Sequence, residues 1–227
     1  MNINTILSKI DYRLSRFAFS RPQYQVELLV QRIKKIHPKY FNSLVEIGGG
    51  YEQRYKRLLS SLTTKYLNLE LKKGDGVDVV GSVYKLPFKN NSIEVETLFM
   101  VMEHLNEPKD ALLECTRVLK KDGYLLITTV QYWHTHNHPS DYLRYTKAGL
   151  EYYCKQAGLN IVKIWSMGGP FLVIFHAIEL NIPDWLRTPY SIVFYSLANW
   201  LDLRVFQHED KRVYSDSVGW SIIAQKA

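Results

Sequence analysis

Apolar runs suited to buried strands alternate with helix-like periodicity through the middle of this chain. A short apolar run bounded by turn residues predicts a strand, and apolar residues spaced three and four apart predict a helix. On this basis we expect strands over 43–47, 66–70, 77–80, 93–100, 124–130, 160–165 and 219–225. We expect helices over 26–36, 51–62, 108–119 and 146–157, the last two capped by Asn106 and Thr146. This alternation predicts a mainly parallel, doubly wound α/β sheet, whose ligands bind beyond the carboxyl ends of its strands.

The two ends of the chain depart from this alternation. Residues 1–20 carry an apolar stripe at helical spacing with basic flanks, which predicts an amphipathic helix that either covers the core or lies on an anionic membrane. Residues 169–206 are rich in aromatic and aliphatic side chains, which predicts helices that cover the active site or form a dimer or membrane-facing surface. We expect one domain, divided into a helical extension (1–42), a cofactor-binding core (43–166), an apolar helical cap (167–217) and a final strand (218–227).

Three consecutive glycines, Gly48–Gly50, follow the first predicted strand. Glycine lets the backbone turn tightly and approach a ligand closely, because no Cβ is in the way. Glu70 ends the second predicted strand, where a carboxylate can accept hydrogen bonds from both hydroxyls of a ribose. Together the two features predict a cofactor that contains adenosine, and they leave open whether it is a nicotinamide dinucleotide or S-adenosylmethionine.

Four further segments follow in order along the chain. They read VDVVGSVYKLPF (77–88), NSIEV (91–95), MEHL (102–105) and RVLKKDGY (117–124). With the glycine turn, this series resembles the class I S-adenosylmethionine-dependent methyltransferases of the methyltransferase-11 type, over about residues 43–166. The resemblance implies a Rossmann-like fold, with a doubly wound seven-stranded sheet whose last strand is antiparallel. It also implies S-adenosyl-L-methionine as the cofactor.

The resemblance further implies which positions hold the cofactor. In the family, the glycine turn holds the methionine part, the acidic residue after strand two holds the ribose, and the segment before the Leu-Pro-Phe run flanks the adenine. Carried over to this sequence, the implied positions are Glu46, Gly48, Gly49, Gly50, Glu70, Leu71, Ser82, Val83, Met100 and Val101.

The chain departs from the family pattern at several points in this region. Glu52 stands where the turn usually has its last glycine, and Ser82 stands where an aspartate is common. Residues 71–76 leave room for a loop where a helix is usual. These departures support one alternative, a non-catalytic subunit that binds S-adenosylmethionine or a partner protein.

The segment after the fifth predicted strand, residues 131–146, is dense in hydrogen-bonding and titratable side chains. Its position predicts contact with the methyl acceptor, and a general base is needed only where the acceptor is a hydroxyl or an acidic carbon. We expect His138 or His136 as that base, with His104 in reserve just past strand four. Acceptor contacts are expected from Tyr132, His134, Asp141, Arg144 and Tyr145.

Two of these assignments leave alternatives open. His134, His136 and His138 alternate, so an extended segment would place them on one side, and a metal site with Asp141 as a fourth ligand is one interpretation. We favour histidines that stabilise the loop or lie at the surface, and expect no metal. Arg144 either grips an anionic acceptor or pairs with Asp141.

Composition and charge change this picture little. The net charge of +7 favours anionic partners, but no lysine-rich tail or RNA-binding motif occurs, so nucleic acid is not favoured as the substrate. Cys115 and Cys154 fall in helical segments and are expected to pack as buried thiols, which fits a reducing cytosol. The N-terminus lacks a secretory pattern, and we expect a cytoplasmic protein, with contact to the inner face of the membrane as an extension of that expectation.

We therefore expect an enzyme that methylates a small polar acceptor, for example a sugar hydroxyl of a surface polysaccharide or its lipid-linked precursor. The apolar segment 169–206 and the basic first helix favour the lipid-linked form. Besides the non-catalytic subunit, one further alternative is a methyltransferase for a lipid quinone or another hydrophobic acceptor.

Overall fold

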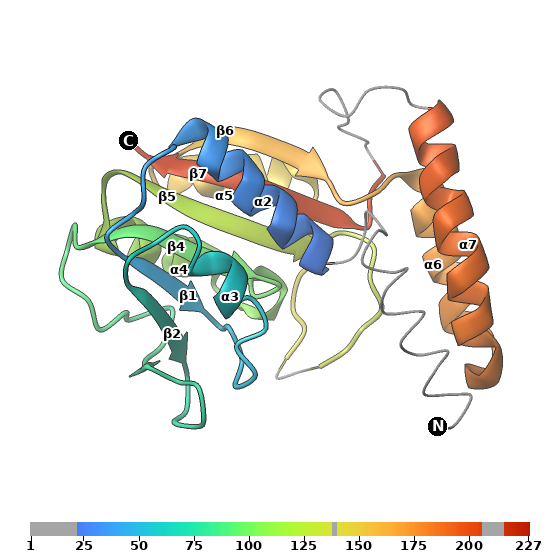
Figure 1. Ribbon diagram of the computed structural model, residues 1–227, viewed down its shortest axis with the longest axis horizontal. Coiled ribbons are helices and arrows are strands. Elements are labelled where there is room, and N and C mark those ends of the chain that lie inside the picture. The colour runs from blue at the N-terminus through green and yellow to red at the C-terminus, as the bar shows by residue number, and fades with distance from the viewer. Residues whose placement is uncertain (1–21, 138–139, 206–215) are drawn as a thin grey trace.

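The computed structural model describes residues 22–137, 140–205 and 216–227, and Figure 1 shows its elements. The helix expected over 1–20, with its membrane contact, and His138 lie outside the described residues. A seven-stranded sheet forms the centre of the molecule. Its strands are β1 (Leu44–Ile47), β2 (Tyr66–Glu70), β3 (Val79–Val80), β4 (Ile93–Phe99), β5 (Leu119–Val130), β6 (Leu159–Ser166) and β7 (Gly219–Lys226).

The strand order is β3-β2-β1-β4-β5-β7-β6. β1 pairs in parallel with β2 and β4, and β4 pairs in parallel with β5, while β7 runs antiparallel to both β5 and β6. The predicted doubly wound sheet with an antiparallel last strand is therefore confirmed. The strand order reverses between β1 and β4, and in open α/β sheets ligands bind at such a switch point, beyond the carboxyl ends of the strands.

Helices cover both faces of the sheet (Figure 1). They are α2 (Pro22–Ile36), α3 (Lys56–Leu59), the 3₁₀-helix η1 (Met102–His104), α4 (Pro108–Val118), α5 (Lys147–Gln156), α6 (Pro170–Asn181) and α7 (Asp184–Val205). α2 packs on one face through buried residues such as Leu29 and Ile33. α4 and α5 pack on the other, where Cys115 and Cys154 are free and buried as expected. Because both faces are covered, all four residues of β1 are buried, as is usual for a parallel strand.

The helix expected over 51–62 is mostly wrong. Residues 51–55 form turns, and α3 spans only four residues, Lys56–Leu59. Gln53 has a φ of +46°, a left-handed conformation that interrupts a helix, and its side-chain amide donates to the Gly76 carbonyl. Glu52 therefore lies in an exposed turn and not in a first helical turn.

One of the two predicted helix caps is confirmed. Thr146 Oγ1 accepts a hydrogen bond from the Gly149 N–H at 3.1 Å, at the start of α5. The cap predicted at Asn106 is wrong, because Glu107 precedes α4 and its side chain makes no capping bond. Asn106 instead accepts a hydrogen bond from the Tyr84 hydroxyl at 2.8 Å.

α6 and α7 form a helical hairpin at one end of the sheet (Figure 1). Asp202 of α7 fixes the start of α6, since its carboxylate accepts from the Gly169 N–H at 2.9 Å and the Leu172 N–H at 3.3 Å. Trp185 and Trp200 leave 78% and 51% of their surface exposed. Within the part of the chain that the structure describes, no helix is both long and apolar enough to cross a membrane.

Candidate cofactor and acceptor site

A cavity of about 390 Å³ opens where β1, β2 and β4 end, at the switch point of the sheet. This volume lies in the range of roughly 300–1,000 Å³ that small-molecule sites occupy. The implied cofactor positions that line it are Gly48, Glu70, Leu71, Ser82, Val83, Met100 and Val101. The other three, Glu46, Gly49 and Gly50, do not line it. Segments far apart in sequence therefore meet at one cavity.

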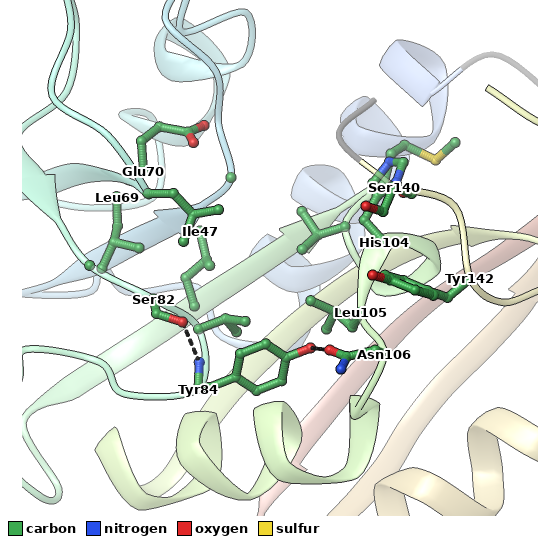
Figure 2. A pocket seen from close by; sticks show the side chains of 16 residues that line it. Ile47, Leu69, Glu70, Ser82, Tyr84, His104, Leu105, Asn106, Ser140 and Tyr142 are labelled. Atoms are coloured by element: carbon green, nitrogen blue, oxygen red, sulfur yellow. Dashed lines mark hydrogen bonds between the residues drawn. The ribbon is translucent and has the colours of Figure 1, made fainter. Parts of the chain in front are cut away.

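Figure 2 shows Glu70 on one side of the cavity, and His104 with Ser140 and Tyr142 on the other. Glu70 comes from the end of β2 and His104 from η1, just past β4. The cavity thus has an acidic side, next to the glycine turn, and a side that carries an imidazole.

The floor of the cavity is built by Tyr84 and Asn106, which are not among the expected site residues. Tyr84 donates its backbone N–H to Ser82 Oγ at 3.2 Å and its hydroxyl to Asn106 at 2.8 Å (Figure 2). Tyr84 and Tyr142 both stand next to positions that were selected, so neighbourhood in the sequence could have found them. Ser140 lies within 131–146, the segment expected to contact the acceptor, but was not named there as a site residue; in the structure its carbonyl contacts His104 Nδ1.

The glycine turn fits a ligand that approaches the backbone. Gly48 has a φ of +75°, and a Cβ there would lie 2.7 Å from Cγ2 of Val101, which itself lines the cavity. The Gly50 N–H donates to Glu70 Oε1 at 2.7 Å, which ties the turn to the carboxylate. Any side chain at Gly48 would therefore strain the backbone and collide with the cavity wall.

Glu46 lies behind the glycine turn. It is buried, the Tyr66 hydroxyl donates to its Oε2, and its Oε1 has no hydrogen-bond partner among the described residues. Burial raises the pKa of Glu46 to about 7, and the nearby carboxylate of Glu70 adds to the rise. A Cβ at Gly49 would lie 2.7 Å from Glu46 Cδ, so Gly49 allows the turn to close over this carboxyl group. Both positions support the turn from behind.

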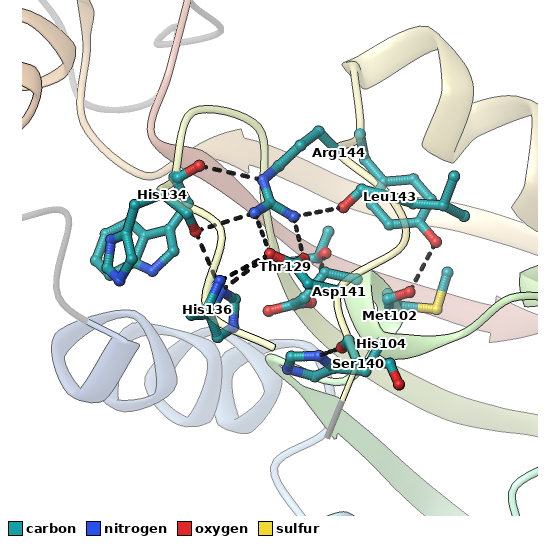
Figure 3. A network of polar contacts seen from close by, with 12 residues as sticks. Met102, His104, Thr129, His134, His136, Ser140, Asp141, Leu143 and Arg144 are labelled. Atoms are coloured by element: carbon teal, nitrogen blue, oxygen red, sulfur yellow. Dashed lines mark hydrogen bonds and ion pairs between the residues drawn. The ribbon is translucent and has the colours of Figure 1, made fainter. Parts of the chain in front are cut away.

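The loop after β5 is organised around an ion pair between Arg144 and Asp141 (Figure 3). Arg144 binds both carboxylate oxygens of Asp141, with Nη2 to Oδ2 at 2.6 Å, and also donates to the carbonyls of Trp133, His134 and Leu143. Hydrogen bonding from Arg144 holds the pKa of Asp141 well below its usual range. Arg144 and Asp141 therefore pair with each other, the second of the two roles considered for this arginine, and do not line the cavity.

The other expected acceptor contacts also lie outside the cavity. Tyr145 is buried and donates to the Met102 carbonyl at 2.8 Å, and Tyr132 donates to Asp216 Oδ1 at 3.2 Å. His134 lines a separate cavity of about 230 Å³ beside α6 and α7. Burial there, and the nearby imidazole of His176, lower the pKa of His134.

Of the expected bases, His104 alone lines the cofactor cavity among the described histidines. Its Nδ1 pairs with the Ser140 carbonyl (Figure 3). His136 lies beside it, with 5.0 Å between the two ring centroids. Glu103, next to His104 in η1, is buried and accepts from Thr129 Oγ1 at 2.9 Å.

Comparison with known proteins finds a family model that matches the middle of the chain. Residues 52–127 match the family model described as a methyltransferase domain. Over 46 residues the chain is 44% identical to an uncharacterized methyltransferase of Schizosaccharomyces pombe, a match that covers 20% of this chain and 16% of that relative. The chain spans about half or less of the curated relatives that it matches.

Solved structures share the fold. Phosphoethanolamine N-methyltransferase 2 of Haemonchus contortus, in complex with phosphomonomethylethanolamine and S-adenosylhomocysteine, aligns with a TM-score of 0.56 at 16% identity, over 94% of this chain and 56% of that one. A SAM-dependent methyltransferase of Archaeoglobus fulgidus aligns with a TM-score of 0.56 at 12% identity, over 95% of this chain and 99% of that one. At these low identities the alignments show a shared fold only.

The matched segment includes Glu70, Ser82, Met100 and His104, which the sheet brings to one cavity beside the glycine turn. A ribose would find the Glu70 carboxylate there, and a methionine chain would find the turn backbone at Gly48, so the residues present fit S-adenosyl-L-methionine. Residues 52–127 therefore resemble a methyltransferase domain, the chain has the fold of S-adenosylmethionine-dependent methyltransferases, and the residues that line the cavity fit S-adenosyl-L-methionine as the cofactor.

Proposed function

We propose that this protein methylates a hydroxyl of a small polar acceptor, and that the acceptor is a sugar. The observation that carries the proposal is the position of His104, an imidazole on the wall of the cofactor cavity, across from Glu70. Bound S-adenosylmethionine would supply a methyl group activated by its sulfonium sulfur, and the sulfur would leave with the carbon–sulfur electron pair. The acceptor must also lose its hydroxyl proton, and this proton needs a base.

His104 is arranged to serve that proton. Its Nδ1 faces the carbonyl oxygen of Ser140, so Nδ1 carries the hydrogen and Nε2 carries the free lone pair. Tyr142 and Asn106 line the same side of the cavity and offer hydroxyl and amide groups that suit a polar acceptor. The remaining contribution of the protein is alignment, because the methyl group is already activated.

The exposed aromatic residues of α7 favour an acceptor that is carried on a lipid. Trp185 and Trp200 lie on the helical hairpin with much of their surface exposed. Tryptophan is enriched where proteins meet a membrane surface, because its ring is amphipathic. The proposal also predicts that the protein contacts a membrane surface peripherally and that it forms a homodimer.

The proposal is tested by following labelled methyl groups from S-adenosylmethionine into sugar nucleotides, lipid-linked glycans and quinols. We expect transfer to a sugar hydroxyl. The variant His104→Asn should lower kcat by about 10²–10⁴-fold, the usual worth of a general base, with the cofactor Kd unchanged. Transfer to a quinol only would contradict the sugar assignment. Cofactor binding without any transfer would favour the non-catalytic alternative.

A second prediction concerns the acidic side of the cavity. The variant Glu70→Ala should weaken binding of S-adenosylmethionine by about 1–3 kcal/mol, or roughly fivefold to 150-fold, because it removes the acceptor of the Gly50 N–H and of the ribose hydroxyls. Isothermal titration calorimetry measures the change. Glu52→Ala is the matched control, since Glu52 carries the same charge near the turn but leaves 86% of its side chain exposed. Equal affinities of the Glu70→Ala variant and the wild type would remove Glu70 from the site.

A further inference from the structure

Three side chains that can bind a metal ion gather beside the cofactor cavity. Glu103, His104 and His136 each bring one ligand atom within 4.8 Å of the others. Glu103 and His104 belong to η1, just past β4. His136 belongs to the loop after β5 and lies near His104 in Figure 3. The centroids of the two imidazole rings lie 5.0 Å apart and the ring planes meet at 75°, an edge-to-face and not a stacked arrangement.

Both imidazoles have their Nδ1 atoms occupied. His104 Nδ1 pairs with the Ser140 carbonyl, and His136 Nδ1 lies 3.3 Å from Asp141 Oδ2 and 3.2 Å from the His134 carbonyl oxygen. Histidines that bind metals donate their other ring N–H to a carboxylate or a carbonyl in this way, which orients the ring and raises its basicity. Each histidine therefore keeps its Nε2 lone pair for an ion.

The carboxylate of Glu103 gives independent support. Glu103 is fully buried, Thr129 donates to its Oε2 at 2.9 Å, and its Oε1 accepts no hydrogen bond from any described residue. A buried oxygen without a partner is costly, and a cation would satisfy it. The hydrogen bond from Thr129 holds the carboxylate in place, as the outer partners of metal ligands do.

We propose that Glu103, His104 and His136 bind a divalent transition-metal ion of the zinc type. Two imidazole nitrogens and one glutamate oxygen form a donor set of catalytic zinc sites, which keep a fourth position open. Ligand atoms about 2.1 Å from a zinc ion lie roughly 3.4 Å apart, so binding would draw the three side chains together. The site differs from the one considered for the alternating histidines, because the Asp141 carboxylate is taken by Arg144.

The position of this site gives it a role in the reaction. His104 lines the cofactor cavity, so an ion held there can accept the acceptor oxygen as a fourth ligand and lower the pKa of its hydroxyl. While the ion is bound, Nε2 of His104 is a ligand, so the ion lowers the pKa of the hydroxyl and the proton passes to solvent water. Without the ion, Nε2 of His104 is the base. This role rests on the proposed function, whereas binding of the ion does not.

The test is metal binding by the full-length protein after treatment with a chelator. Titration with Co²⁺, followed by visible absorption, and with Zn²⁺, followed by calorimetry, should each give one equivalent. Glu103→Gln and His136→Asn should weaken binding by more than about 100-fold, since outer-shell partners alone are worth 10–100-fold. His134→Asn, which alters the neighbouring histidine outside the cluster, should bind the ion as the wild type does. Circular dichroism and the affinity for S-adenosylmethionine show whether each variant is folded.

The outcomes separate this inference from the proposed function. The metal site would be overturned if the wild-type protein bound neither ion. It would also be overturned if the folded Glu103→Gln variant bound the ion as tightly as the wild type. Methyl transfer that proceeds in chelator would then leave the proposed function standing. Conversely, an ion bound in one equivalent by a protein that transfers no methyl group would support the site and contradict the proposed function.

Discussion

Replacing Asp141 by alanine is expected to lower the free energy of unfolding by about 2–4 kcal/mol. The Asp141 side chain is only 1% exposed, and its removal leaves the guanidinium of Arg144 without its carboxylate and the His136 N–H without its acceptor. Because the same arginine ties together three carbonyls of the loop, the loop should open locally. Urea denaturation at pH 7, followed by circular dichroism, measures the loss.

The pH dependence of this effect has a definite sign. Hydrogen bonding from Arg144 holds the pKa of Asp141 below its ordinary value of about 3.9, so the stabilisation is fully present above that value. It is lost as the pH falls through the lower pKa of the folded state. The difference between wild type and Asp141→Ala should therefore be constant from pH 5 to 7 and shrink below about pH 4.

An exposed ion pair provides the control for Asp141→Ala. Arg54 and Glu52 lie 3.8 Å apart with 66% and 86% of their side chains exposed, so Arg54→Ala should change stability by less than about 0.5 kcal/mol. If Asp141→Ala lowers the free energy of unfolding no more than Arg54→Ala does, the ion pair between Asp141 and Arg144 does not organise the loop.

The second large effect concerns Glu96, which lies fully buried in β4 under α4. Burial raises the pKa of Glu96 to about 8, and the neighbouring carboxylate of Glu114 adds to the rise. Because the folded-state pKa lies above the unfolded value of about 4.3, the favourable contribution is complete below that value and is lost as the pH rises toward 8. Each pH unit in this window costs about 1.4 kcal/mol.

Glu96→Gln is therefore expected to become more stable relative to the wild type as the pH rises. Between pH 5 and pH 8 the difference in free energy of unfolding should shift by about 3–4 kcal/mol in favour of the variant. Glu94→Gln is the control on the same strand. Although partial burial acts in the opposite direction, hydrogen bonds from Asn42 and Lys120 lower the pKa of Glu94, so its difference from wild type should stay constant over this range. A flat difference for Glu96→Gln would mean that Glu96 is ionised in the folded protein.

The fold and the cofactor side of the site could be predicted because their signals are local. A buried parallel strand is a continuous apolar run, and the glycine turn and Glu70 sit where such strands end. The prediction of a helix over 51–62 was wrong because apolar spacing does not reveal the conformation of Gln53. Its backbone is left-handed, and its side-chain amide donates a hydrogen bond to the Gly76 carbonyl. The contact partner of Gln53 is distant in sequence, and no local pattern indicates it.

The acceptor side depends on such distant contacts. The sequence places Tyr145 in a loop, but its side chain is buried and its hydroxyl donates to the Met102 carbonyl. Arg144 donates to loop carbonyls and so is not available to an acceptor. The alternation of His134, His136 and His138 indicates that they share one side of an extended segment. It does not indicate that His136, which follows β5, lies beside His104, which follows β4. The cluster with Glu103 could be found only once β4 and β5 were side by side.

The cavity at the ends of β1, β2 and β4 is expected to bind S-adenosyl-L-methionine. Calorimetric titration of the purified protein with S-adenosyl-L-methionine and, separately, with NAD tests it most directly, because both ligands carry an adenosine that Glu70 could hold. We expect one equivalent of S-adenosyl-L-methionine to bind and NAD to give no heat of binding. Binding of NAD alone, or of neither ligand, would mean that the cavity is not an S-adenosylmethionine site.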